Sequence, residues 1–401
     1  QIKEETVDSE DEATLWQQVD AELQDSTGSV AKFVNQIITN GIDNKVSDIH
    51  IEPRLSGYIV RYRKDGMLQK VLDVPAKVET SVIARFKVMA RMNIAENRRP
   101  QDGTFSISYN GCSYDFRINT LPVSGKEKVC IRILAPAVSL ASNDKEIKLV
   151  GAVEADIQKV KQMISCPNGI ILTSGPTGSG KSTTLAAMID YINRTRAEHI
   201  LTIEDPVEFV HTSKVSVIHQ RELGMDTRSF ANALKSALRE DPDIILVGEM
   251  RDHETIALAL TAAETGHLVF GTLHTSSASQ TIDRIIDVFP EGQQQQIRVQ
   301  LANSLVAVFA QTLLPKRQPD GSRKGRVMAQ EIMVVTPAIA NLIRESKAAQ
   351  IYSTIQTSTG AGMQTLESSL AALFKKGLVT LDDAMSKSSK PNELKRLIQG
   401  G

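Results

Sequence analysis

The sequence predicts an α/β protein with a parallel sheet, preceded by a smaller α+β domain and followed by a helical C-terminal region. After residue 150, short apolar segments alternate with segments of helical spacing, which is typical of a parallel sheet wrapped by helices. Before that residue, short segments alternate apolar and polar side chains and are joined by tight-turn signals, which indicates half-buried strands. Beyond Leu313 segments of helical spacing dominate.

Composition narrows the classes of protein that need to be considered. The 401 residues, enough for two or three domains, carry 46 Lys and Arg against 47 Asp and Glu. This balance argues against a general nucleic-acid binder, which is usually clearly basic. No run of 18 apolar residues occurs, so we expect no membrane-spanning helix. Buried, reduced thiols are expected rather than a disulfide framework or a Cys-rich metal site, because the cysteines are few and scattered: Cys112, Cys130 and Cys166.

Charge and pattern divide the chain into five parts. Residues 1–27 contain nine acidic side chains and one lysine, which predicts an acidic, solvated linker. We expect an N-terminal α+β domain over residues 28–137, a connector over 138–150, an α/β core over 151–315 and a helical subdomain over 316–401. The first residue is Gln rather than Met, so we expect a piece of a longer protein.

The first domain is expected to combine two helices with a set of strands. Apolar spacing predicts helices over residues 31–39 and 78–92. Alternation predicts strands over 48–52, 58–63, 105–109, 114–119 and 129–134. Lys64-Asp65-Gly66-Met67 and Asn110-Gly111 predict tight turns.

The second half begins with a predicted helix over residues 153–164. Apolar strands are expected over 169–173, 200–204, 244–247 and 268–272, with helices between them over 182–193, 229–238 and 252–265. The C-terminal helices are expected over 337–344, 348–357, 365–376, 380–385 and 392–398.

One segment fits a phosphate-binding loop, because it follows the pattern G-x-x-x-x-G-K-S/T between an apolar strand and a helix. It reads Gly175-Pro176-Thr177-Gly178-Ser179-Gly180-Lys181-Ser182 and is followed by Thr183. Glycines let main-chain N–H groups surround phosphate oxygens, and the helix N-terminus adds a favourable dipole. We expect these residues to bind ATP, with Lys181 on the β- and γ-phosphates and Ser182 on Mg²⁺.

Two further strands end in acidic residues. Glu249 follows the apolar strand Asp243-Ile244-Ile245-Leu246-Val247, and Glu204 ends the strand Leu201-Thr202-Ile203. In a parallel sheet both ends lie on the side of the phosphate loop, where ligands collect. We expect one acid to organise Mg²⁺ and another to orient or deprotonate the attacking water. Acids that only cap the next helix are the alternative.

Histidines flank the strand over residues 268–272. His274 follows its end, at the expected edge of the phosphate loop, which makes sensing of the γ-phosphate a hypothesis for this residue. A purely structural role is the alternative for both His274 and His267.

The first domain supplies arginines near turns and strands. The planar guanidinium suits phosphate because it donates two parallel hydrogen bonds. Ordinary surface charge is the alternative for each of these residues: Arg98, Arg99, Arg117 and Arg132.

Taken together, these residues resemble the motor ATPases of type II secretion and type IV pili, the family of GspE, PilB and PilT. The resemblance runs from about residue 31 to the C-terminus and covers four characteristic boxes, at residues 175–182, 202–208, 246–252 and 266–275. It implies a RecA-like ATPase domain, a PAS-like first domain and a helical C-terminal region.

The resemblance also implies roles for individual residues. Glu204 would be the general base on the attacking water. Glu249 would act on Mg²⁺ by contacting the ligands of the ion rather than the ion itself. His267 and His274 would couple the nucleotide state to domain movement. Arg117, in Asp115-Phe116-Arg117-Ile118-Asn119, would close over the nucleotide. Members of this family are similar to one another in working as rings of six.

Departures from the family pattern point to two different branches. The assembly and secretion branch has Arg after Gln-Asp-Gly, where this chain has Thr104. That branch also carries a four-cysteine zinc hairpin, whereas residues 316–326 are expected to form a short, Cys-free loop, so we expect no zinc. Residues 338–345 match the characteristic helix of the retraction branch except at Ala340, while residues 47–53 resemble the assembly branch.

The leading hypothesis is therefore a homohexameric, cytoplasmic ATPase that drives pilin or pseudopilin assembly. It would use ATP and Mg²⁺, reach the inner membrane only through a platform protein of a pilus or secretion machine, and bind no nucleic acid. Retraction of a type IV pilus is the close alternative. A DNA-translocating ring ATPase and a nucleotide-sensing scaffold without turnover remain as alternatives from other classes.

Overall fold

The computed structural model describes residues 28–64, 66–134 and 154–399. The chain divides into two compact units, Gln1–Pro136 and Ala137–Gly401, and each is described by itself. The expected acidic linker over residues 1–27 and the expected connector over 138–150 lie outside the described residues. Within the described residues no helix is both long enough and apolar enough to cross a membrane.

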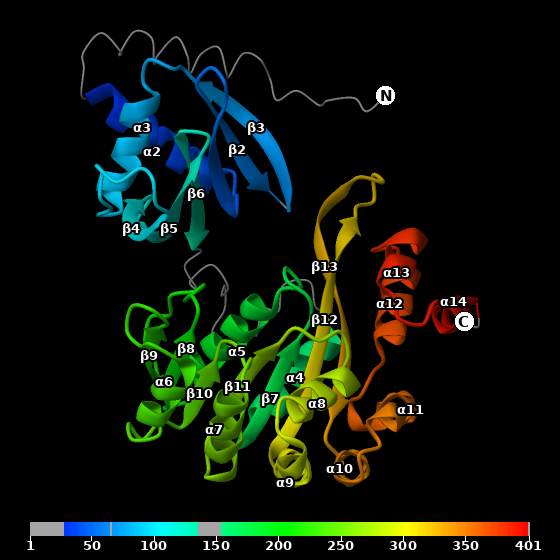
Figure 1. Cartoon of the computed structure of the whole chain (residues 1–401). Helices are drawn as coiled ribbons and strands as arrows, with labels where there is room; N and C mark the ends of the chain where they lie inside the picture. The colour runs from blue at the N-terminus through cyan, green and yellow to red at the C-terminus, as the bar shows by residue number, and fades with distance from the viewer. Residues whose placement is uncertain (1–27, 65, 135–153, 400–401) are drawn as a thin grey trace. The chain divides into compact units, whose positions relative to one another are not determined.

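The first unit is a six-stranded antiparallel sheet with strand order β3-β2-β1-β6-β5-β4 (Figure 1). Its strands are β1 (Asp48–Pro53), β2 (Tyr58–Lys64), β3 (Met67–Val74), β4 (Gln101–Tyr109), β5 (Cys112–Val123) and β6 (Lys126–Leu134). Helices α2 (Gly28–Asp43) and α3 (Glu79–Met89) pack on one face and share an apolar core with it. The expected helices and strands of this domain are all present, and β3 joins them after the turn at Gly66.

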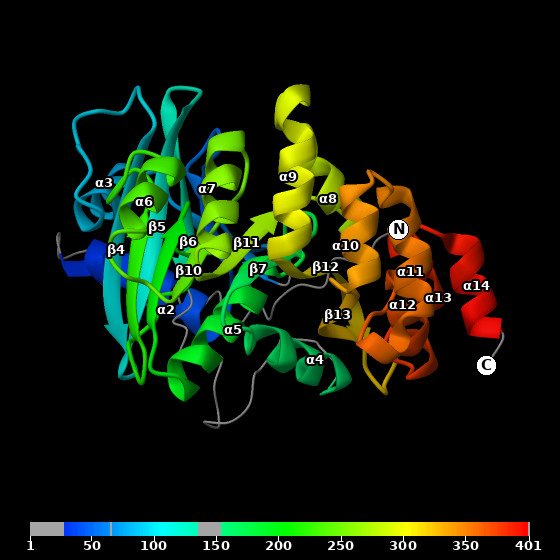
Figure 2. The ribbon, with the colours of Figure 1, turned by 90° about the horizontal axis from the view of Figure 1, so that it is seen from below.

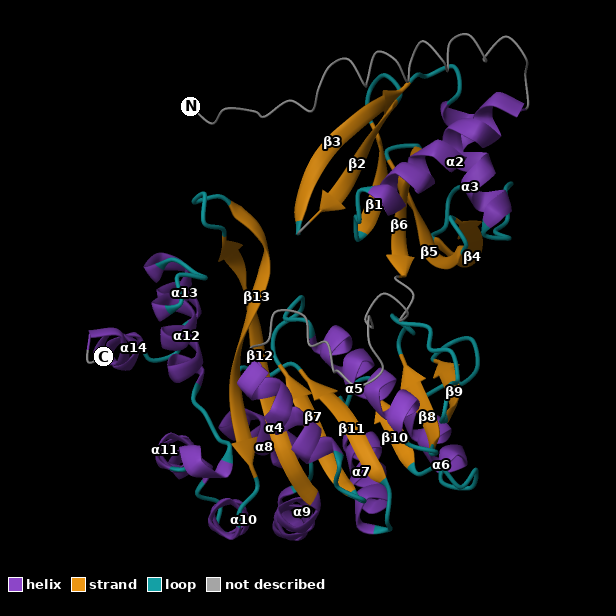
Figure 3. Cartoon of the chain, turned by 180° about the vertical axis from the view of Figure 1, so that it is seen from behind, coloured by secondary structure: helices purple, strands orange, loops and turns teal. Residues whose placement is uncertain are grey.

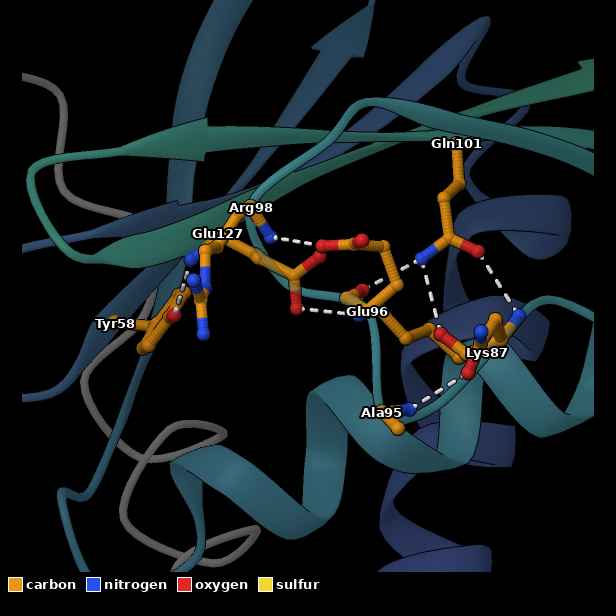
Figure 4. A network of polar contacts seen from close by, with 8 residues as sticks. Tyr58, Lys87, Ala95, Glu96, Arg98, Gln101 and Glu127 are labelled. Atoms are coloured by element: carbon orange, nitrogen blue, oxygen red, sulfur yellow. Dashed lines mark hydrogen bonds and ion pairs between the residues drawn. The ribbon is translucent and has the colours of Figure 1, made fainter.

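A buried ion pair holds the segment between α3 and β4 in the first unit (Figure 4). Lys87 is 1% exposed, and its Nζ lies 2.6 Å from a carboxylate oxygen of Glu127 on β6. The same ammonium donates to the carbonyl of Glu96 at 2.8 Å, which Gln101 also contacts through its Nε2 at 2.7 Å. These bonds fix the main chain just before Arg98 and Arg99.

Lys87→Met should destabilise the first unit by about 3–5 kcal/mol, because it leaves the Glu127 carboxylate buried without its cation. The double variant Lys87→Met with Glu127→Leu should recover most of that loss, because it removes the unpaired charge. Hydrogen exchange of the β1 and β6 amides in the full chain measures this local stability. A double variant as unstable as the single one would contradict the explanation.

The second unit is built on a seven-stranded sheet with strand order β13-β12-β7-β11-β10-β8-β9. All neighbours are parallel except β12 and β13, which form an antiparallel pair. The strands are β7 (Gly169–Ser174), β8 (His199–Glu204), β9 (Val217–Glu222), β10 (Ile244–Val247), β11 (Leu268–Leu273), β12 (Leu305–Arg317) and β13 (Arg323–Val334). The central strands β7, β10 and β11 are buried along their whole length, as expected for apolar parallel strands covered on both faces.

Helices cover both faces of this sheet (Figure 2). Each face has its own apolar core. On one face lie α4 (Glu154–Ile164) and α5 (Lys181–Thr195). On the other lie α6 (Phe230–Ala237), α7 (His253–Glu264), α8 (Ala278–Asp287) and α9 (Glu291–Ser304). This arrangement confirms the expected α/β fold.

The C-terminal helices follow β13 (Figure 3). They are α10 (Pro337–Arg344), α11 (Ile351–Thr357), α12 (Leu366–Lys375), α13 (Leu381–Lys387) and α14 (Pro391–Gln399), close to the expected positions. The helical subdomain expected over residues 316–401 needs a correction, because its first part contains the end of β12 and the whole of β13. Residues 316–326, expected to be a loop, form the end of the β12–β13 hairpin. The turn signal Pro319-Asp320-Gly321 between two apolar stretches indicates such a hairpin.

Candidate active site

Four parallel strands bring the expected site residues to one edge of the sheet. The phosphate-loop segment follows β7, Glu204 ends β8, Glu249 lies two residues past β10, and His274 follows β11. The parallel registers of β7, β11, β10 and β8 place these four ends side by side. Ligands of open α/β sheets bind at the carboxyl ends of the strands, so this edge is the candidate active site.

The loop after β7 has the backbone conformation that a phosphate cradle requires. Gly175, Gly178 and Gly180 have φ of 145°, 78° and 89°, which glycine adopts without strain. A Cβ on Gly175 would lie 2.4 Å from the carbonyl oxygen of Gln311 and 2.5 Å from Ser179 Oγ. The loop is therefore packed closely enough to exclude any larger residue at this position.

Helix α5 begins directly after this loop. Its first intrahelical bond runs from the N–H of Thr184 to the carbonyl of Gly180. The N–H groups of Lys181, Ser182 and Thr183 are therefore left without intrahelical acceptors, which is the standard basis of anion binding at a helix N-terminus. Ser179 Oγ is buried without a hydrogen-bond partner among the described residues. These features fit the phosphate groups of a nucleotide.

Gly175→Ala should weaken nucleotide binding by about tenfold or more, because the new methyl group meets main-chain and side-chain atoms at a positive φ. Gly292→Ala is the matched control, since a Cβ there meets nothing within 4 Å and lies in the first turn of α9. Titration with a fluorescent ADP analogue measures the nucleotide affinity of both variants. Equal affinities for the two variants would show that the loop tolerates a side chain.

Lys181 lies over the loop that precedes it. Its Nζ donates to the carbonyls of Gly175 at 2.8 Å and Pro176 at 3.2 Å, and lies 3.5 Å from His274 Nδ1. Burial lowers the pKa of Lys181, and the negative charge of Glu249 opposes that shift. The ammonium is thus held at the loop by weak, neutral acceptors that phosphate oxygens can replace.

Glu249 and His274 form the next part of the site. His274 Nε2 lies 3.3 Å from Glu249 Oε1, and the same oxygen pairs with Arg251. Because the other ring nitrogen of His274 faces Lys181, the imidazole connects the carboxylate after β10 with the lysine of the phosphate loop. This bridging position gives His274 a route by which to sense the charge at the loop.

Glu204 is held on the neighbouring strand. Its Oε1 accepts hydrogen bonds from Thr202 Oγ1 at 2.7 Å and Gln220 Nε2 at 3.2 Å. Burial raises the pKa of Glu204 above its ordinary value despite these bonds. The N–H of Gly248 donates to the carbonyl of Ile203 at 2.7 Å, so the ends of β8 and β10 touch. The site thus combines a buried carboxylate of raised pKa with a second carboxylate whose charge acts on Lys181.

Other candidates lie elsewhere. His267 precedes β11 and therefore lies at the opposite edge of the sheet, where its Nδ1 is 2.9 Å from the carbonyl of Ala262. The structure does not bring His267 together with the site residues, and the coupling role that the resemblance implied for it stays a prediction. Arg117 lies on β5 of the first unit, in register with Arg132 on β6, and its phosphate contact stays a prediction.

The structure adds three residues that the sequence patterns do not predict. Thr202 and Gln220 orient Glu204, and Gln311 on β12 donates to the carbonyl of Ser179 at 2.8 Å. Only Thr202 carries a signal, through its place two residues before the acid on the same face of the strand. Among the described residues no three His, Cys, Asp or Glu side chains are grouped to hold a metal ion by themselves.

Comparison with known proteins gives a consistent family. The model of the type II/IV secretion system protein family matches residues 23–386. The chain is 60% identical, over 58% of its length, to the type IV pilus retractation ATPase PilT of Pseudomonas aeruginosa. It is 38% identical, over 77% of its length, to the type II secretion system protein E of Xanthomonas campestris. The chain spans 66% and 52% of the lengths of these two relatives.

A solved structure agrees with this assignment. The crystal structure of the pilus retraction motor PilT with bound ADP superimposes with a TM-score of 0.72 at 42% sequence identity. The match covers 90% of this chain and 98% of that one. At this coverage the similarity extends over parts of both described units.

Proposed function

The chain belongs to the type II/IV secretion system protein family of motor ATPases, and we propose that it hydrolyses ATP to move a pilus or secretion machine. One observation carries this proposal. Lys181, His274 and Glu249 form a connected chain at the phosphate loop, and Glu204 lies on the adjoining strand end. We assign to Lys181 the role of cation for phosphate, to Glu249 that of an acid acting on Mg²⁺, and to Glu204 that of a base for water.

Each residue has a distinct part in the proposed reaction. The N–H groups of the loop and of the first turn of α5 orient the phosphates, and Lys181 stabilises negative charge that develops on them. Glu204 accepts the proton of the attacking water, which its raised pKa favours. Ser182 and Glu249 are assigned to Mg²⁺, which neutralises phosphate charge when bound.

We propose that the active form is a homohexamer and that it acts at the inner membrane through a platform protein. Two observations support the family role: the PilT match covers nearly the whole of that motor, and the family model extends from residue 23 to residue 386. The molar mass, measured by light scattering at several protein concentrations, tests whether the chain forms a homohexamer. A chain that hydrolyses ATP fully as a monomer would contradict it.

The proposal also concerns whether the motor retracts or assembles a pilus. Pilus retraction is the first candidate, because the identity to the retractation ATPase PilT is 60% against 38% to the secretion protein E. Assembly is the second candidate, favoured by residues 47–53 of the first unit. In the structure Asp48 of that segment pairs with Arg63 and Arg132 across three strands.

Deleting the gene in the host organism and imaging its pili separates the two candidates. Excess, non-retracting pili support retraction, and bald cells support assembly. Complementation with Lys181→Ala, which should bind nucleotide weakly and show no measurable hydrolysis, shows whether the phenotype depends on ATP. Normal pili and normal secretion in the deletion strain would contradict both candidates.

A further inference from the structure

A buried polar chain runs from the phosphate loop toward the C-terminal helices. Gln311 on β12 and Gln330 on β13 are 3% and 1% exposed and face each other across the antiparallel pair. Gln330 Nε2 lies 3.5 Å from Gln311 Oε1. Burying two side-chain amides costs free energy unless their polar atoms are paired, so the contacts that they make need an explanation.

Gln311 holds the phosphate loop at two points. Its Nε2 donates to the carbonyl of Ser179 at 2.8 Å, and its Oε1 accepts from Thr184 Oγ1 at 3.0 Å. The loop approaches β12 so closely that a Cβ on Gly180 would lie 3.3 Å from Gln311 Nε2. One amide thus joins the last part of the loop to the first turn of α5.

The bond to Ser179 has a consequence for phosphate binding. In a planar trans peptide the carbonyl oxygen and the following N–H point in opposite directions. Holding the Ser179 carbonyl toward Gln311 therefore turns the N–H of Gly180 away from β12. Gly180 is the residue before Lys181 at the N-terminus of α5, where N–H groups bind phosphate oxygens.

Gln330 continues the chain toward the C-terminal segment. Its main-chain N–H donates to Ser369 Oγ on α12 at 3.2 Å, and its main-chain carbonyl accepts from Gln364 Nε2 at 3.1 Å. Gln364 also exchanges two main-chain bonds with Ile332, at 2.9 and 3.0 Å. The connection between Ser179 and α12 therefore runs through hydrogen bonds and through Gln330 itself, whose side-chain amide faces Gln311 and whose main chain bonds to Ser369 and Gln364.

We propose that Gln311 is a positioning residue of the phosphate loop and that Gln330 couples occupancy of the loop to the segment around Gln364 and Ser369. The proposal rests on the proposed function, since it assumes that the loop binds ATP. A bound nucleotide that shifts the loop first changes the hydrogen bond between Ser179 and Gln311. The amide of Gln330, whose Oε1 is buried without a partner among the described residues, follows it.

The first test replaces the amide with an apolar side chain of similar length. Gln311→Met should weaken binding of a fluorescent ADP analogue about tenfold and raise the KM for ATP by a similar factor. It should lower kcat much less, because Glu204 and Lys181 are unchanged. Gln294→Met is the matched control, because Gln294 also donates its Nε2 to a main-chain carbonyl, that of Phe289, but from α9.

The outcomes of this test separate the two proposals. A folded Gln311→Met variant with wild-type affinity overturns the positioning role. A wild-type protein that does not bind the analogue contradicts the proposed function instead. If Gln311→Met does not fold, Thr184→Val removes the other anchor of the same amide and should weaken binding in the same direction. Wild-type affinity of that variant would also overturn the positioning role.

The second test follows the C-terminal end of the chain by hydrogen exchange. ADP should slow exchange of the amides of Ile332, Gln364 and Ser369 in the wild type and in Gln294→Met. In Gln330→Met that response should disappear, while the change in affinity stays smaller than for Gln311→Met. A nucleotide response that persists in Gln330→Met, or is missing in the wild type while ADP binds, overturns the coupling.

Discussion

Glu204→Gln is expected to lower kcat for ATP hydrolysis about a thousand-fold, the scale of a lost general base. The amide keeps the size of the side chain and its bond from Thr202, so the strand end should stay in place. It cannot take a proton from water. Affinity for ADP should stay close to the wild-type value, because Lys181 and the loop are untouched.

The pH dependence gives this prediction a second readout. Burial raises the pKa of Glu204 from 4.5, and only the ionised carboxylate can accept a proton. Activity should therefore fall as the pH is lowered through the raised pKa. The stability effect has the opposite sign, because a raised pKa means that the folded protein holds the proton more tightly. The stabilisation that the protonated Glu204 side chain contributes is fully present below pH 4.5 and is lost as the pH rises through the folded-state pKa.

Glu198→Gln is the matched control, since Glu198 lies just before the other end of the same strand and pairs with Arg196. It should leave kcat and its pH profile unchanged. If Glu204→Gln kept a tenth or more of the wild-type kcat, the base would have to be sought elsewhere. The residual pH profile of that variant would then report the group responsible.

The strand ends show why much of this site can be predicted from sequence. Glu204, Glu249 and His274 each follow a short apolar run, and parallel strands carry their carboxyl ends to one edge. The phosphate loop is a local pattern with glycines at required backbone angles. Local pattern and sheet direction are enough to assemble these residues.

Contacts across the sheet are not predictable in the same way. Gln311 reaches Ser179 only because β12 adds to the sheet beside β7, and its place in an apolar stretch gives no sign of a polar contact. The β12–β13 hairpin is not among the predicted elements, because its long apolar runs fit a helix as well as a strand, although the turn signal Pro319-Asp320-Gly321 lies between them. His267 shows that closeness in sequence does not ensure closeness in space. It precedes β11 while His274 follows it, so the two histidines lie at opposite ends of one strand.

Lys181→Ala should weaken ADP binding about 100-fold and abolish measurable hydrolysis at ordinary ATP concentrations, since a bond to a charged group is lost at the phosphates. The reason lies in its position. Its Nζ rests on the carbonyls of Gly175 and Pro176, and these acceptors yield to phosphate oxygens because those carry full charge. Removal of the ammonium leaves the loop without the cation that balances the phosphates.

The same substitution also tests whether phosphate binding by Lys181 is independent of the contact between His274 and Glu249. Without Lys181, His274 keeps its contact with Glu249, so the end of β11 should remain in place. Lys235→Met is the matched control, because Lys235 forms an exposed ion pair with Glu254 on the helix pair α6 and α7. It should bind ADP like the wild type. Equal loss of affinity in both variants would point to general destabilisation, whereas loss confined to Lys181→Ala assigns the phosphate contact to this lysine.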